Sequence, residues 1–188
     1  MRKVFLSVIL IFISHICSAP NIGFRFEMLK FQSLYGLINQ RYHESEFSRF
    51  VNDLGSSESG NNWLSINLIG CFGEWQFEES TLNFLGYRKI TLKRFKANPD
   101  IFPRELQLKA LKTLIRVNLL YLMDYEHFIG DSINGVVITK SGMIAASHLG
   151  GAGSLQKFLD SNGRINRKDV LGTSISDYLK RFRFYDLD

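Results

Sequence analysis

The stretch PRELQLKALKTLIRVNLLYL, residues 103–122, carries the longest helical pattern in the chain. Pro103 suits the first turn of a helix, because its ring fixes φ and its missing N–H has no partner to lose there. The pattern predicts a helix that begins at Pro103, ends near Tyr125 and buries one apolar stripe. That stripe consists of Leu108, Leu111, Ile115, Leu119 and Leu122.

Shorter helical patterns lie upstream of this segment. Ser45 is placed to cap a helix that runs into Glu58, because the apolar residues after it recur at helical spacing. A second pattern covers residues 76–85 and stops at Gly86. The polar residues 87–102 are predicted to form a connection between this helix and the long one.

Downstream, residues 141–149 are predicted to form a short buried helix, and residues 154–159 another. Thr173 is placed to cap a last helix that carries Tyr178. The clearest strand pattern is the β-branched run 136–138. The sequence therefore predicts a mainly α domain with few short strands.

The amino end has the features of a secretory signal peptide. Arg2 and Lys3 precede an uncharged apolar run over residues 4–13, and small residues at 17–19 come before Pro20. We expect residues 1–19 to be a cleavable leader and the protein to be periplasmic or secreted.

Removal of the first 19 of 188 residues leaves 169, enough for one well-buried domain over residues 20–188. The apolar run of the leader is too short to span a bilayer, and no later run is long enough, so no membrane span is expected after cleavage. A lipoprotein with its lipid on Cys17 is the alternative, but Ile16 stands where a small residue is normally found.

The charge of the processed chain is mildly basic. Loss of Arg2 and Lys3 lowers the 23 basic residues to 21, against 18 acidic ones. This balance suits an anionic cell-wall polymer, although the basic residues are spread out. Nucleic acid is not an expected partner for an exported chain.

The chain offers little to a metal or a cofactor. Cys71 is the only cysteine after processing, so no disulfide can form within the domain, and we interpret it as a small buried apolar residue. The three histidines outside the predicted leader, His43, His127 and His148, lack the short spacing of a metal site. We therefore predict no metal and no cofactor.

Glu58 is the candidate for chemistry, because it closes an amphipathic helix just before the chain turns at residues 59–62. A carboxyl group there can face a cleft while apolar neighbours reduce its solvation. Reduced solvation favours the protonated form, which a general acid needs in order to protonate a glycosidic oxygen.

Four short segments follow in a characteristic order: Glu58-Ser59, then Gly73-Glu74-Trp75-Gln76, then residues 145–153 (AASHLGGAG), then Tyr178. This order resembles the lytic transglycosylase and goose-type lysozyme family. There a Glu-Ser pair precedes a Gly-Leu-Met-Gln segment, an Ala-Tyr-Asn-Ala-Gly segment and a late tyrosine. The step of 18 residues from Glu58 to Gln76 fits the family spacing.

The resemblance covers roughly residues 45–185 and implies a lysozyme-like α fold. It implies action on the β-1,4 bond between N-acetylmuramic acid and N-acetylglucosamine in peptidoglycan. Glu58 would be the only catalytic acid and base. It would protonate the leaving oxygen and then take a proton from the muramic 6-hydroxyl, giving a 1,6-anhydro product.

The resemblance also assigns substrate contacts. Ser59 belongs to the Glu-Ser pair, Trp75 could pack on a sugar face or lie in the core, and Gln76 could bind hydroxyl or acetamido groups. Tyr178 resembles the tyrosine that hydrogen-bonds the catalytic carboxyl. Ser147 and His148 stand where the family has Tyr-Asn, so sugar binding there depends on the histidine.

Glu74 is the only nearby candidate for a second carboxylate. A hydrolytic glycosidase needs such a partner, so Glu74 facing the cleft opposite Glu58 would make a muramidase credible. We favour the reaction with one carboxylate. The alternatives are a hydrolase, a noncatalytic peptidoglycan-binding or scaffolding protein that kept the fold, and a toxin-like or phage-derived lysin.

Overall fold

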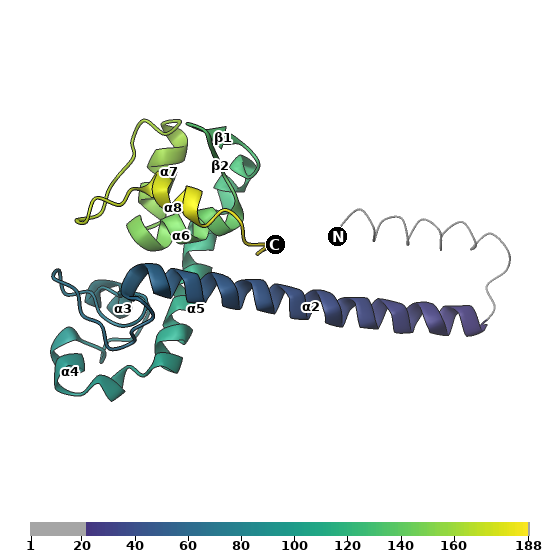
Figure 1. Ribbon diagram of the computed structural model, residues 1–188, viewed down its shortest axis with the longest axis horizontal. Helices are drawn as coiled ribbons and strands as arrows, with labels where there is room; N and C mark the ends of the chain where they lie inside the picture. Colours follow the sequence, from purple (N-terminus) through teal and green to yellow (C-terminus); the bar gives the residue numbers. More distant parts are fainter. Residues whose placement is uncertain (1–21, 188) are drawn as a thin grey trace. The chain divides into compact units, whose positions relative to one another are not determined.

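The computed structural model describes residues 22–187, with side chains from residue 28 (Figure 1). The predicted signal peptide and Cys17 lie outside this range. The described chain divides into two units between Tyr42 and His43. The first unit contributes the amino-terminal part of helix α2 (Ile22–Ser59), and the second holds the remaining elements.

The described chain is mainly helical, as predicted. After α2 come α3 (Glu79–Phe84), α4 (Leu92–Ala97), the 3₁₀ turn η1 (Pro99–Ile101), α5 (Arg104–Tyr121) and the 3₁₀ turn η2 (Met123–Phe128). Strands β1 (Ser132–Ile133) and β2 (Val136–Val137) pair antiparallel, with Ile133 opposite Val136. Helices α6 (Lys140–Gly150), α7 (Ala152–Asp160) and α8 (Ile175–Arg181) follow, and α6 packs on both α7 and α8 (Figure 1).

Helix α5 confirms the predicted stripe. Pro103 stands at its N-cap with φ −64°, and Leu111, Ile115 and Leu122 are buried. Leu108 and Leu119 are partly buried against the same core. The helix ends at Tyr121 rather than near Tyr125, because the chain tightens into η2.

Helix α2 corrects the prediction that a helix begins at Ser45. It starts at Ile22 and passes through Ser45 without interruption. No proline occurs in this helix, so the backbone has no reason to stop before the Gly60 turn. The carboxyl end lies where the sequence predicted it, at Glu58 and Ser59.

The helix predicted over residues 76–85 is shorter than expected, because the chain forms a tight turn over residues 72–78. Phe72 and Phe77 exchange backbone hydrogen bonds across a tight turn in which Gly73 and Gln76 both have positive φ. Left-handed backbone cannot continue a helix, so α3 starts only at Glu79. The connection 87–102 also differs from the prediction, since it contains α4 and η1.

The cap of the last helix lies one residue after the predicted one. Ser174 is the N-cap of α8, and its side chain and that of Asp177 form a capping box. The hydrogen bonds from Ser174 hold the pKa of Asp177 below its usual value. Thr173 precedes this cap.

Tyr185 fastens the carboxyl end of the second unit to α2. Its hydroxyl donates to Asp53 Oδ2 at 2.6 Å, and its ring packs edge-on against Phe50. Burial first, and then the bond to Asp53, raises the pKa of Tyr185 to about 12. The phenol therefore keeps its proton in the folded chain at pH values where an unfolded tyrosine, of pKa about 10, would lose it.

Tyr185→Phe is expected to lower the free energy of unfolding by about 1 kcal/mol near neutral pH. Because the folded pKa is raised, the contribution of Tyr185 is complete below about pH 10 and is lost as the pH rises through about 12. Urea unfolding at neutral and alkaline pH should therefore show the gap between wild type and variant closing. A gap that stays constant would contradict this role.

Candidate active site

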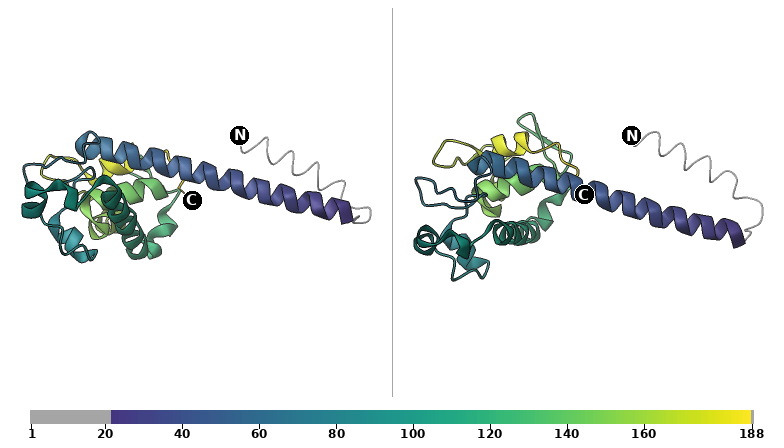
Figure 2. Two further views of the ribbon diagram at one scale, coloured as in Figure 1. Left: turned by 90° about the horizontal axis from the view of Figure 1, so that it is seen from below. Right: turned by 60° about the horizontal axis from the view of Figure 1, so that its bottom comes forward.

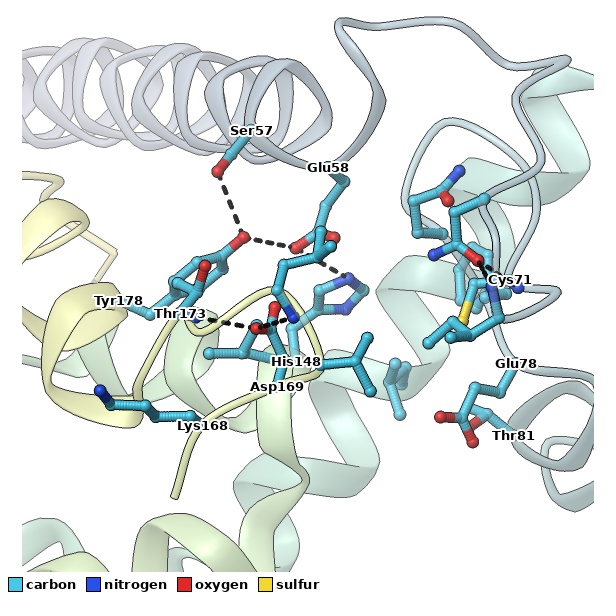
Figure 3. A pocket seen from close by; sticks show the side chains of 18 of the residues that line it. Ser57, Glu58, Cys71, Glu78, Thr81, His148, Lys168, Asp169, Thr173 and Tyr178 are labelled. Carbon is cyan, nitrogen blue, oxygen red and sulfur yellow. Dashed lines mark hydrogen bonds and ion pairs between the residues drawn. The ribbon is translucent and has the colours of Figure 1, made fainter. Parts of the chain in front are cut away.

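A cavity of about 420 Å³ lies within the second unit, at the carboxyl end of α2 (Figure 3). This volume is in the range of small-ligand sites. Its walls come from the end of α2, the loop before α3, helices α3 and α5, the end of α6, the loop between α7 and α8, and α8 itself. Four residues that the sequence singled out line it together: Glu58, Gln76, His148 and Tyr178.

Glu58 is held by Tyr178. The tyrosine hydroxyl donates to Glu58 Oε1 at 2.8 Å, across a sequence separation of 120 residues. Only 15% of the Glu58 side chain and 4% of Tyr178 are exposed. Burial, with the nearby charge of Glu58, raises the pKa of Tyr178 well above its usual value, so the phenol remains a hydrogen-bond donor.

A second donor chain leads to the same tyrosine. Arg181 Nη1 lies 2.5 Å from Ser57 Oγ, and Ser57 Oγ lies 3.2 Å from the Tyr178 hydroxyl. A guanidinium can only donate, and an ionised Glu58 can only accept. The Ser57 hydroxyl therefore donates to Tyr178, and the Tyr178 hydroxyl donates to Glu58. Each donor in this series strengthens the next hydrogen bond.

His148 approaches Glu58 from α6. Its Nε2 lies 3.0 Å from the backbone oxygen of Trp75 and 3.8 Å from Glu58 Oε1. Because a carbonyl oxygen only accepts, Nε2 carries the hydrogen. Within residues 22–187, neither His148 Nδ1 nor Gln76 Oε1, both buried, has a hydrogen-bond partner.

Four other residues of the sequence prediction do not line the cavity. Trp75 is fully buried, and its indole donates to Val51 O at 3.0 Å. Ser147 is 1% exposed and bonds within α6. Ser59 donates to Glu74 O at 2.7 Å and closes the end of α2. These three side chains hold the walls in place, and buried Trp75 and Ser147 cannot reach a sugar.

Glu74 is the fourth predicted site residue that does not line the cavity. It is fully buried behind the end of α2, and Arg104 binds both its oxygens, through Nε at 2.5 Å and Nη2 at 2.8 Å. Its backbone N–H donates to Gln107 Oε1 at 2.7 Å. This carboxylate is an internal ion-pair partner and does not face Glu58 across the cavity.

Cys71 lines the cavity, and it is a buried residue, as the sequence indicated. It is 7% exposed, and burial raises the pKa of its thiol. A thiol that stays protonated near neutral pH is a poor nucleophile. Within the described residues, no group of three or more His, Cys, Asp or Glu side chains could hold a metal ion.

The sequence prediction missed Ser57, Arg181 and the charged residues of the loop between α7 and α8. Arg181 could have been found, because it stands three residues after Tyr178 and so on the same helix face. Lys168 and Asp169 line the cavity from a loop whose path no helical or strand periodicity reveals.

No protein-family model, no curated protein and no solved structure matches this chain.

Proposed function

We propose that this protein is an exported enzyme that cleaves peptidoglycan glycan strands, with Glu58 as its single acid and base. The observation that carries the proposal is the 2.8 Å hydrogen bond from Tyr178 to Glu58 inside a cavity. Both residues belong to the ordered segments that resemble the lytic transglycosylase and goose-type lysozyme family. Gln76, from the second segment, and His148, from the third, line the same cavity.

In this proposal the protonated carboxyl of Glu58 gives its proton to the glycosidic oxygen as the bond between that oxygen and C1 of N-acetylmuramic acid breaks. The resulting carboxylate takes the proton of the 6-hydroxyl while the oxygen of that hydroxyl bonds to C1. No water is added, the product is a 1,6-anhydro sugar, and Glu58 ends in its starting state.

Glu74 is placed where it cannot be a second catalytic carboxylate, which favours the reaction with one carboxylate. Glu78 and Asp169 line the cavity as Glu58 does, but Glu78 is exposed and Asp169 accepts two backbone N–H groups of its own turn. A retaining hydrolase needs a nucleophile close to the acid, and an inverting one needs a base that activates water on the opposite face of the sugar. Glu74 is buried and bound at both oxygens by Arg104, so it is free for neither role. Tyr178, Ser57 and Arg181 instead converge on Glu58 alone.

Mass spectrometry of the products from purified murein tests the proposal. Incubation with the purified protein is expected to release muropeptides that end in 1,6-anhydro-N-acetylmuramic acid. Reducing ends would show a hydrolase and remove the one-carboxylate mechanism. Protein that sediments with murein but releases nothing would show a noncatalytic wall-binding protein, an alternative motivated by His148 in place of the family asparagine.

A further inference from the structure

Two turns at the cavity are built in the same way. The first is Asn67-Leu68-Ile69-Gly70, and the second is Asp169-Val170-Leu171-Gly172. In each, the side-chain oxygen of the first residue accepts the N–H groups two and four residues later, at 2.8–3.1 Å. Each ends in a glycine of positive φ, 88° and 90°. We call them the two tip turns.

Each tip turn presents two aliphatic side chains to solvent. Leu68 is 102% exposed and Ile69 57%, while Val170 is 70% and Leu171 80% exposed. Ile69, Val170 and Leu171 also line the cavity, so both turns stand at its mouth. Figure 2 shows the loop before α3 and the loop between α7 and α8 at the same end of the second unit.

The aliphatic side chains of the tip turns are exposed because hydrogen bonds fix the backbone of each turn. In both turns the backbone N–H of the first residue also donates to the carbonyl oxygen four residues later, Asn67 to Cys71 and Asp169 to Thr173, each at 2.9 Å. Two closed turns that hold aliphatic pairs in water point to an apolar environment that receives them.

The charges beside the second turn indicate which apolar environment. Arg164, Arg167 and Lys168 are exposed in the eight residues before Gly172, while the one acid there, Asp169, is engaged by the turn itself. Exposed aliphatic tips flanked by arginine and lysine are suited to the boundary between acyl chains and anionic headgroups. A protein partner would require a continuous contact surface, whereas lipid closes around separate tips.

We infer that the two tip turns dock the mouth of the cavity onto an anionic phospholipid surface. Leu68, Ile69, Val170 and Leu171 enter the acyl boundary, and the basic residues of the second loop bind the headgroups. This inference does not depend on the proposed function, because it rests on the exposed side chains and the basic residues of these loops and not on the chemistry at Glu58.

Flotation with vesicles tests the docking. The purified protein is expected to float with vesicles of phosphatidylcholine and phosphatidylglycerol, and less with phosphatidylcholine alone. The double variant Leu68→Ser/Leu171→Ser should reduce the bound fraction roughly tenfold or more, because two buried leucines are lost. The control is Leu120→Ser/Met123→Ser, since these side chains are 71% and 62% exposed but do not line the cavity.

A second measurement separates the tip turns from any other membrane-binding part of the chain. Tryptophan is placed at Leu171 in one variant and at Leu120 in another, and emission is recorded with vesicles containing brominated lipid. Quenching of the added tryptophan only at position 171 supports the inference. Equal flotation of the two serine variants, absence of flotation, or equal response at both positions would overturn it.

Discussion

Glu58→Gln is expected to reduce release of muropeptides from murein by roughly a thousandfold or more, because an amide cannot exchange the proton that both steps need. The amide can still accept from Tyr178, so the cavity should keep its shape. The measurement is the rate of soluble product release at equal protein concentration, together with co-sedimentation of the variant with murein.

Glu78→Gln is the matched control for this variant. Glu78 lines the same cavity but is exposed, and it is not bonded to Tyr178. The control changes the charge of the cavity by the same amount, so its activity should stay within a few-fold of wild type. If Glu58→Gln released product as fast as Glu78→Gln, Glu58 would have no part in the mechanism.

Arg104→Met is expected to destabilise the protein by about 3 kcal/mol, since it leaves the buried Glu74 carboxylate without its partner. The guanidinium also lies 5.7 Å from the centre of the Trp75 ring, so part of the loss is packing. Urea unfolding near neutral pH gives the free energy directly.

The double variant Arg104→Met/Glu74→Gln separates these two causes. It removes the charge together with its partner, so it should recover a large part of the stability lost in Arg104→Met. Arg183→Met is the control for loss of a cation from an aromatic ring, because Arg183 lies over exposed Phe184 at 4.6 Å. Additive losses in the double variant would show that the ion pair itself contributes little.

The helices whose apolar residues repeat over several turns could be predicted from the sequence. The stripe on α5 and the buried helix α6 are found as expected, because periodicity reports which face is buried. The start of α2 could not be predicted in this way, since a helix can extend beyond its buried stripe when nothing in the sequence stops it.

Periodicity and motif order did not reveal whether a given side chain is buried in the core or lines the cavity. Trp75 and Gln76 are neighbours, yet one is fully buried while the other lines the cavity. The positive φ of Gln76 turns the chain between them, within the tight turn that the backbone hydrogen bonds between Phe72 and Phe77 close. Glu74 is likewise buried because Arg104, thirty residues later, neutralises it.

The tip turns could nonetheless have been predicted from the local sequence. The tip turns share an Asn or Asp followed three residues later by glycine, a turn signal that needs no knowledge of the fold. What local sequence could not show is that two such turns, about a hundred residues apart, meet at one cavity.

The two oxygens of Glu58 are not equivalent. Tyr178 donates to Oε1, and His148 Nε2 lies 3.8 Å from that same atom while its hydrogen is directed to Trp75 O. Tyr178 therefore fixes Oε1 in place, while Oε2 takes no part in this hydrogen bond. In the proposed mechanism, Oε1 would be the anchored oxygen and Oε2 the atom that exchanges the proton with the substrate, so the proton would be delivered from a single direction.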